Sequence, residues 1–177
     1  IGTQGKIIAN AWDETLGGVI AFRVDNDLIV DGEINADGLG FQQHRTVGWT
    51  SGSYGYRGET YLYASDSLTR NAYLGAGGGG RAGVADSYYA SGSGGGGYGT
   101  AGTDGSPGWN AALTSLMPST YAGVGGGTYG VSDLSRLYFG SSSGSNAETA
   151  GTGGGIIFIT SGNITGTGII TSQGTGN

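Results

Sequence analysis

GGVIAFRVDNDLIVDGEINADG, at residues 17–38, and GGIIFITSGNITGTGIITSQG, at residues 154–174, are two versions of one motif near the two ends of the chain. We call them the first repeat and the second repeat. Each opens with Gly-Gly and a β-branched run, crosses a polar turn into another short apolar run, and closes with Gly-x-Ile-x-x-x-Gly. β-Branched residues bounded by Gly, Asn and Asp are strand signals, so we expect two or three short strands in each repeat.

The two repeats align with one extra residue in the turn of the first. A repeat of about 20 residues that contains several short strands is typical of the stacked coils of a β-solenoid. The expected strands are Val19–Val24 with Ile156–Thr160, Leu28–Val30 with Ile164–Thr165, and the closing segments Gly32–Gly38 with Gly168–Gly174.

Alternation within the closing segments predicts which side chains face inward. In the first repeat, Ile34 and Ala36 should point inward and their polar neighbours outward. Ile169 stands in the second repeat where Glu33 stands in the first. The second repeat is therefore apolar on both faces at this point, and we expect another segment or another subunit to cover it.

Glycine supplies 42 of the 177 residues, much of it in runs between the two repeats. Two interpretations are open. The runs could adopt an extended polyproline-II-like conformation and pack side by side, since only glycine lets such backbones approach closely. Alternatively, each run could be a tight turn at the corner of a solenoid. The runs are Gly77–Gly80, Gly94–Gly97, Gly125–Gly127 and Gly153–Gly155.

These patterns predict one all-β domain over residues 1–177, with almost no helix. We expect a short-stranded β-solenoid or β-sandwich with packed, polyglycine-II-like segments. Within the middle, DLSRLYFG at 133–140 alternates as a strand would, and WNAALTSLM at 109–117 is the one helical candidate. The expected parts are an inter-subunit strand at 1–10, related β motifs at 11–41 and 151–177, and a Gly/Tyr-rich middle at 42–150.

The two repeats, together with GGGGYGTAGTDG at 94–105 and DLSRLYFGSSSG at 133–144, resemble glycine-rich secreted bacterial surface and filament proteins. The same combination looks like the glycine-rich adhesin tips of phage tail fibres, in which polyglycine-II helices pack together. The resemblance spans nearly the whole chain. It implies an extracellular structural or adhesive role and supplies no catalytic residues.

The composition argues against several classes of function. The net charge of −6 without a basic stripe disfavours nucleic acid as a partner, and no apolar stretch approaches the 18 residues of a membrane span. The chain has no cysteine, and its one histidine, His44, lies in a polar loop sequence without a recognisable nucleophile motif. We therefore expect a protein that is not an enzyme and needs no cofactor.

A bound calcium ion is the weaker of the two expectations, and the absence of any cofactor is the stronger. Asp25 and Asp27 flank Asn26 in the turn of the first repeat, and their oxygens are ligands that suit Ca²⁺. The turn lacks the spacing and the distal Glu of an EF-hand loop. The competing interpretation is a solvated turn whose carboxylates accept hydrogen bonds from backbone amides.

The eleven tyrosines also have two interpretations. They could fill the space beside glycine backbones, or they could form a surface that stacks on sugar rings and contacts proteins. Tyr88, Tyr89 and Tyr98 are the leading candidates for such a surface.

Two functions of different classes follow. The first is a self-assembling subunit of a surface fibre, which binds copies of itself head to tail because strand edges at the ends of a solenoid pair with other chains. The second is an extracellular adhesin that recognises a cell-surface glycan or protein through tyrosine-rich loops. The residues expected to mediate self-assembly are Ile7, Ile8, Ile156, Ile157, Ile169 and Ile170.

Overall fold

A computed structural model of the chain describes residues 1–42, 54–62, 67–80, 91–108, 116, 118–133, 135–145 and 150–176. Its regular secondary structure is strand, apart from one turn of 3-10 helix at Ser119–Tyr121. The expected all-β class with almost no helix is confirmed for the described residues. The strands are β1 (Lys6–Ile8), β2 (Val19–Arg23), β3 (Leu28–Ile29), β4 (Glu33–Asn35), β5 (Ile156–Thr160), β6 (Ile164–Thr165) and β7 (Ile169–Thr171).

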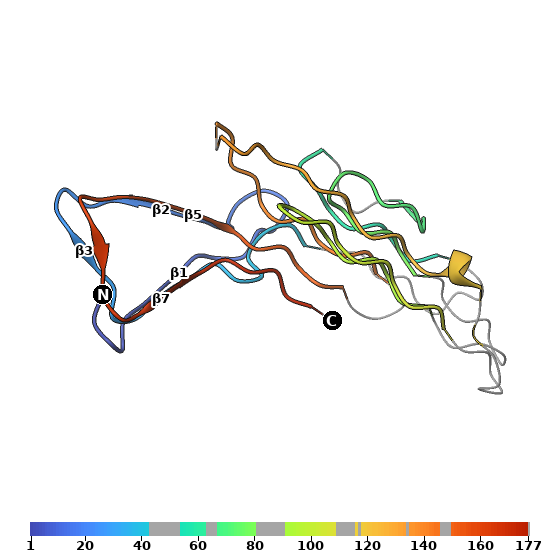
Figure 1. Ribbon diagram of the computed structural model, residues 1–177, viewed down its shortest axis with the longest axis horizontal. Coiled ribbons are helices and arrows are strands. Elements are labelled where there is room, and N and C mark those ends of the chain that lie inside the picture. Colours follow the sequence, from blue (N-terminus) through green and yellow to red (C-terminus); the bar gives the residue numbers. More distant parts are fainter. Residues whose placement is uncertain are drawn as a thin grey trace.

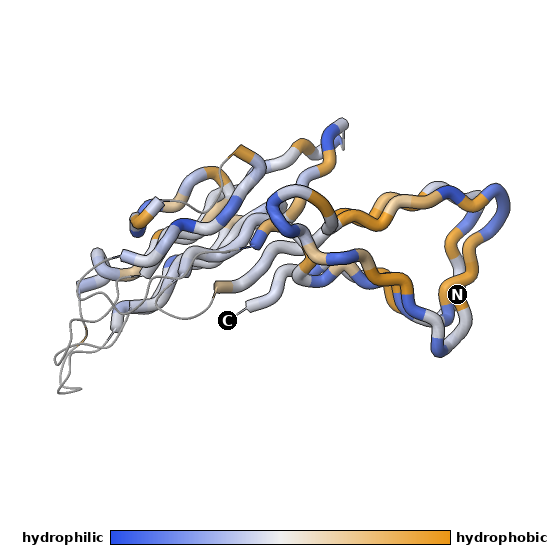
Figure 2. The backbone as a smooth tube through the Cα atoms, turned by 180° about the vertical axis from the view of Figure 1, so that it is seen from behind, coloured by the Kyte–Doolittle hydropathy of each residue, from blue (hydrophilic) through white to orange (hydrophobic). Residues whose placement is uncertain are grey.

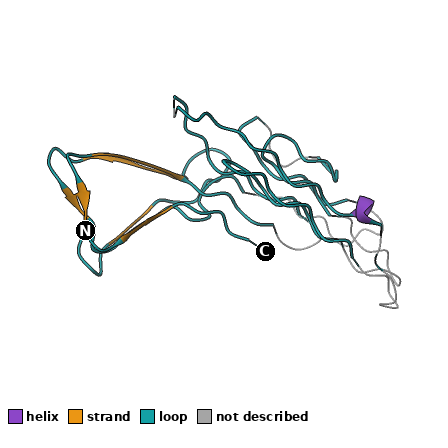
Figure 3. Ribbon diagram, viewed as in Figure 1, coloured by secondary structure: helices purple, strands orange, loops and turns teal. Residues whose placement is uncertain are grey.

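The two repeats lie against each other as three parallel strand pairs. β2 pairs with β5, β3 with β6, and β4 with β7. The register matches the sequence alignment, since Val19 lies opposite Ile156 and Glu33 opposite Ile169. The strands form the sides of a triangle at one end of the molecule (Figure 1). All of the strands belong to this triangle, and the rest of the described chain is drawn as loop apart from the short helix at Ser119–Tyr121 (Figure 3).

The core of the triangle is apolar and belongs mainly to the first repeat. Ile34 and Ala36 are completely buried, as the alternation predicts, and Ile20, Leu28 and Val30 pack with them. Hydrophobic residues are concentrated along the triangle, whereas the extended segments beside it are close to neutral in hydropathy (Figure 2). Hydrophobic burial therefore stabilises one end of the molecule much more than the other.

Carboxylates of the first repeat also bind the second repeat. Asp27 Oδ1 accepts a hydrogen bond of 2.8 Å from Asn163 Nδ2, and Asp37 Oδ1 accepts one of 2.8 Å from the Thr171 hydroxyl. Asp31 accepts from the backbone amide of Thr167. These bonds tie the turns of one repeat to those of the other along the outside of the triangle.

β1 extends the β4–β7 sheet within the same chain. It pairs in parallel with β4, and the Lys6 ammonium lies 2.6 Å from a Glu33 carboxylate oxygen. The segment 1–10, expected to contact another subunit, therefore has one strand edge engaged internally. The self-assembly prediction for Ile7 and Ile8 now concerns only the outer edge of β1, which is unpaired among the described residues.

Extended segments between the two repeats form what we call the glycine bundle, comprising the described residues from 54 to 145. Its backbone hydrogen bonds repeat every third residue: Gly77 and Gly80 donate to the carbonyls of Ser142 and Ser145, while Gly78 between them donates to Val124. Strand ladders have a period of two, so this pattern differs from a β-sheet. The same spacing joins Gly94 and Gly97 to Gly78 and Gly75, Gly123 and Gly126 to Gly92 and Gly95, and Gly102 and Gly105 to Gly126 and Gly123.

Neighbouring backbones in the glycine bundle touch directly. A Cβ atom built on Gly78 would lie 1.8 Å from the carbonyl oxygen of Arg70, and one on Gly79 would lie 2.0 Å from that of Gly55. Real Cβ atoms do not approach oxygen so closely, so these positions accept no side chain. Gly75–Gly80 are all buried.

Two local expectations for the middle of the chain turn out differently. The described residues of this stretch, 133 and 135–140, contain no strand, and the segment from Leu137 to Gly140 is an extended part of the bundle whose Gly140 amide donates to Gly154. From Gly140 to Gly144 the lateral bonds follow the three-residue period, so the alternation of side chains does not signal a sheet. The helix expected at 109–117 lies outside the described residues, except for Leu116.

Aromatic packing and a buried carboxylate join the triangle to the bundle. Trp12 and Phe41 from the first part of the chain pack on Phe139 of the bundle, with ring centroids 5.2–6.2 Å apart. The Trp12 indole N–H donates a 3.0 Å hydrogen bond to Glu59, which is 5% exposed, and the backbone amide of Gln42 donates to the same carboxylate. The junction therefore combines apolar contact with directional bonds.

Adjacent glycines in one run provide a test of backbone contact. We expect Gly126→Ala to destabilise the protein by about 1–3 kcal/mol, because the added methyl would meet the Gly75 carbonyl at 1.8 Å. Gly127→Ala should be nearly neutral, since its methyl would lie 3.3 Å from the Leu74 carbonyl and meet nothing closer. Denaturant unfolding of the two variants measures the difference, and equal midpoints would contradict the contact.

Candidate functional site

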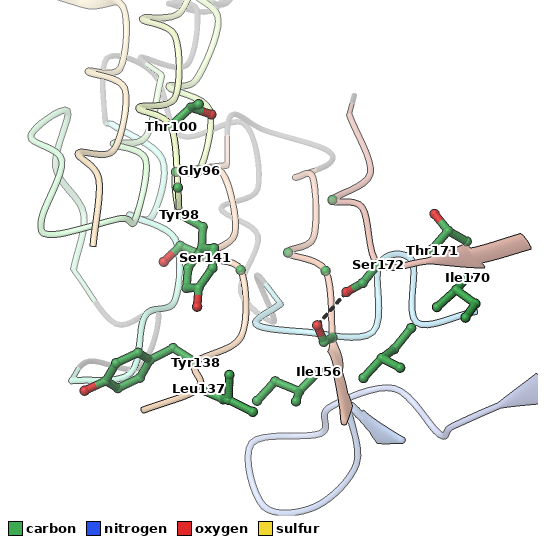
Figure 4. Close-up of a pocket in the computed structure, with 18 of the residues that line it drawn as sticks. Gly96, Tyr98, Thr100, Leu137, Tyr138, Ser141, Ile156, Ile170, Thr171 and Ser172 are labelled. Atoms are coloured by element: carbon green, nitrogen blue, oxygen red, sulfur yellow. Dashed lines mark hydrogen bonds between the residues drawn. The ribbon is translucent and has the colours of Figure 1, made fainter. Parts of the chain in front are cut away.

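An open hollow of about 720 Å³ lies where the second repeat meets the glycine bundle. Figure 4 shows Ile156 and Ile170 entering it from the second repeat, and Leu137, Tyr138 and Tyr98 from the bundle. Glycine backbone at 96–97 and 153–155 lines the space between these side chains. None of the lining residues is charged. The hollow thus has an isoleucine half and a tyrosine half.

The isoleucine half is the uncovered end of the triangle. Ile170 is 43% exposed, whereas its register partner Ile34 is fully buried. Ile164 is 49% exposed, whereas its partner Leu28 is 7% exposed. The inward positions of the second repeat are thus apolar like those of the first, but no further layer of strands covers them among the described residues. We call this surface the open end.

Backbone groups at the open end are also available for pairing. The Ile156 amide donates to the Gly18 carbonyl, and the Thr160 carbonyl accepts from the Val24 amide. In a parallel pair, alternate residues direct their backbone groups to the same neighbour. The amides and carbonyls of Ile157 and Ile159 consequently point away from β2, toward the open end.

The tyrosine half is the visible part of a cluster that we call the tyrosine cluster, Tyr61, Tyr98, Tyr129 and Tyr138. Tyr61 and Tyr138 have ring centroids 4.5 Å apart, and Tyr98 meets Tyr129 edge to face at 5.0 Å. Tyr129 is the inner member, because an added Cβ on Gly75 would meet its ring at 2.1 Å and its hydroxyl donates to the Phe139 carbonyl. Tyr61 is 39% exposed. Tyr129 therefore covers glycine backbone, while Tyr98 and Tyr138 are half-buried and Tyr61 is exposed.

Burial raises the pKa of the Tyr129 hydroxyl well above its ordinary value of 10.0, although a hydrogen bond with Ser141 opposes the shift. The nearby Tyr98 and Tyr61 rings add a smaller effect in the same direction. Tyr129 therefore stays neutral over the whole physiological pH range. The cluster offers uncharged rings and hydroxyl groups, which suits contact with neutral polar surfaces rather than acid–base chemistry.

A smaller hollow of about 430 Å³ lies on the glycine bundle and carries mainly hydroxyl groups and backbone. Ser93, Thr103 and Ser143 line it together with Thr152 and Thr175. This hollow, too, has no charged lining residue. Neither of the two hollows therefore brings together an acid and a base.

The structure brings some predicted site residues together and separates others. Ile156, Ile157 and Ile170 line the hollow together with Tyr98. Ile169 faces outward and is 62% exposed, so the second repeat is apolar on both faces, as the sequence indicated. Ile7 and Ile8 belong to β1, on the opposite side of β4 from β7. Tyr88, Tyr89 and His44 lie outside the described residues.

The acidic turn makes contacts of its own. Asp25 forms an exposed ion pair of 3.2 Å with Arg23, and Asp27 accepts the bond from Asn163. In the part of the chain that the structure describes, no three His, Cys, Asp or Glu side chains gather as a metal site. Calcium at Asp25 and Asp27 stays a prediction.

Sequence reasoning missed four of the residues that matter here. The sequence predicts strand at Ile159 and Ile164 but no site role, although the register of the repeats places them at the open end with Ile157 and Ile170. For Leu137 and Tyr138 it predicts a strand, whereas both lie in an extended segment without strand structure. No local signal in the sequence connects these two residues to the second repeat.

Comparisons with known proteins provide no assignment. No protein-family model matches the chain, and no curated protein or solved structure matches it either. Across the described ranges, no helix has the length and apolar character needed to cross a membrane. The function is therefore inferred from the residues of this chain alone.

The raised pKa of Tyr129 has a consequence at alkaline pH. Above pH 10 this hydroxyl ionises in the unfolded chain but stays protonated in the folded one, so its contribution to stability is complete below pH 10 and is lost as the pH rises further. Tyr129→Phe should lose about 1 kcal/mol at pH 7 with the hydrogen bond to Phe139, and then show a shallower alkaline decline than the wild type. Denaturant unfolding between pH 7 and 11 measures both effects, with Tyr54→Phe as the control. Parallel alkaline declines of wild type and Tyr129→Phe would contradict it.

Proposed function

We propose that the protein is a non-enzymatic extracellular adhesin, which recognises a cell-surface glycan or protein through tyrosines held on the glycine bundle. The observation that carries this proposal is the tyrosine cluster, in which Tyr98 and Tyr138 line an uncharged hollow and Tyr61 beside them is exposed. Aromatic rings stack on the apolar faces of sugars and contact proteins at a small cost in side-chain entropy.

The proposal includes a finer description of the fold. The chain passes the three sheets in the same cyclic order in both repeats, which supports a short, three-sided β-solenoid. Hydrogen bonds that recur at every third residue support a polyglycine-II bundle, since the polyproline-II helix has three residues per turn. The bundle is then a large insertion between β4 and β5 at one corner of the solenoid.

A bundle of this kind suits recognition because it is preorganised. Each backbone is fixed by several neighbours, so the tyrosines need little further ordering when a ligand binds. The position of Tyr138 illustrates this, since its segment is bonded to the bundle through Ser141 and to the second repeat through Gly140. A fixed aromatic platform is what a sugar ring requires for stacking.

The uncharged lining of the hollow also fits an uncharged ligand on a cell surface. The protein itself would then be extracellular or attached to the cell surface. The net charge of −6 makes nucleic acid and anionic lipid poor partners. No cofactor is part of the proposal.

A self-assembling fibre subunit is the second candidate, and the open end favours it. Exposed strand edges with apolar side chains are surfaces on which other chains pair. Head-to-tail assembly would bring the open end of one chain to the β1 side of the next, where Ile7 and Ile8 lie. Negative-stain electron microscopy separates the two candidates, since a fibre subunit forms long polymers and an adhesin forms discrete particles.

Removing the two tyrosines that line the hollow tests the adhesin proposal. We expect wild-type protein to bind members of a glycan array or intact cells, and Tyr98→Ala combined with Tyr138→Ala to weaken that binding by about tenfold or more, which corresponds to about 1.4 kcal/mol. Tyr54→Ala, whose hydroxyl bonds to Thr120 elsewhere in the bundle, is the matched control and should bind like the wild type. Unchanged binding by the double variant would exclude the tyrosine cluster as the recognition surface.

A further inference from the structure

We propose that the open end pairs with the open end of a second copy of this chain, about a twofold axis that passes through Phe158, to give a closed dimer. This inference goes beyond recognition and concerns the other half of the hollow. It rests on the backbone pattern of β5, on the side chains of the second repeat, and on the contrast between the two ends of the triangle.

The backbone of β5 is arranged for antiparallel pairing about its own centre. Ile157 and Ile159 direct their amides and carbonyls toward the open end, while Ile156 and Thr160 direct theirs to the first repeat. With the axis at Phe158, Ile157 of one copy lies opposite Ile159 of the other, and the two residues exchange both backbone hydrogen bonds. The two Phe158 residues then form a close pair without hydrogen bonds, with Cα atoms about 4.5 Å apart.

The same twofold axis also brings apolar side chains of the two copies together. Ile157 and Ile159 are register partners of the inward residues Ile20 and Phe22, so inward residues of one copy meet inward residues of the other. The axis also brings β6 of one copy over β7 of the other, since it exchanges the two remaining sides of the triangle. Ile164 therefore meets Ile170, and both of these half-exposed residues become buried.

A second copy suits this surface for two reasons. The pairing continues the contact that the second repeat already makes with the first, in which apolar inward residues stack on apolar inward residues. The surface also carries no charge, so two chains of net charge −6 can meet here without placing carboxylates face to face.

The opposite side of the triangle does not offer the same surface. There Ile1, Ile7 and Ala9 pack against the core, and Ile20 is only 5% exposed. The Ile1 amino group also donates to the Ile29 carbonyl at the edge of β3. The closed state of this side favours pairing between two open ends over head-to-tail stacking.

Most of each glycine bundle extends away from the triangle, and only a few of its residues, such as Leu137 and Tyr138, border the open end (Figure 1). Each bundle joins the triangle at the corner that leads from β4 to β5 (Figure 1). A twofold axis through the middle of β5 carries this corner to the opposite end of the β5 side, so the two bundles extend in different directions. A dimer would then hold two tyrosine clusters, and two-point attachment to one surface raises apparent affinity.

Cysteine cross-linking tests the axis, because the chain has no cysteine of its own. Phe158→Cys should form a disulfide-linked dimer under mild oxidation, since the expected separation of the Cα atoms lies within the range of a disulfide. Ala21→Cys is the matched control: Ala21 is the exposed register partner of Phe158 in the first repeat, and it should not cross-link. Light scattering after size exclusion should give twice the chain mass for the wild type.

The outcomes separate the alternatives. Cross-linking of Phe158→Cys with itself, lost when Ile164→Asp and Ile170→Asp are added to it, supports the proposal, provided that circular dichroism shows the added changes leave the fold intact. A disulfide formed only when Phe158→Cys is mixed with Ala21→Cys would overturn it in favour of head-to-tail stacking. A monomeric wild type without cross-links would also overturn it, and retained glycan binding in that case would leave the proposed function standing.

Discussion

Direct contact between main chains is the constraint on which the rest of this structure depends. In the glycine bundle, an amide of one segment meets the carbonyl of the next with no side chain between them, as where the Gly78 amide donates to the Val124 carbonyl. Such packing obtains its stability from many hydrogen bonds, each worth only about 1 kcal/mol, rather than from apolar area. Contact between main chains explains why the bundle is rich in glycine and nearly neutral in hydropathy. It also explains why the tyrosines gather at the edge of the bundle.

The triangle is stabilised in a different way, by apolar side chains rather than by contact between main chains. Its strands are short, so it relies on a few large apolar side chains, with Ile34 at the centre, and on Asp27 and Asp37 that bind the second repeat from outside. Trp12 and Gln42 then help connect the apolar core to the polar bundle through hydrogen bonds to the buried Glu59. The two halves of the hollow reflect this division, because each is built by one of the two kinds of packing.

The strands could be predicted from the sequence because their information is local. The Gly-Gly openings, the β-branched runs and the one-residue difference between the turns place Glu33 opposite Ile169, as observed. The packing of the bundle is not local in this sense. Neighbouring segments such as those of Gly77 and Ser142 are specified by hydrogen bonds between identical backbone groups, which leave no pattern of residue types. The sequence pattern therefore predicts strand at Leu137 and Tyr138, and it does not reveal that they line one hollow with the second repeat.

Inserting the bundle between β4 and β5 also sets an order of events. Asp27 and Asn163 meet across 136 residues of chain, so the second repeat is synthesised only after the whole bundle and joins the first through long-range contacts. Contacts between such distant parts of a chain carry a large loop-closure entropy and slow the folding rate. β5, β6 and β7 are the last strands to be synthesised. Until they leave the ribosome, the nascent chain carries no apolar open end on which another chain could pair.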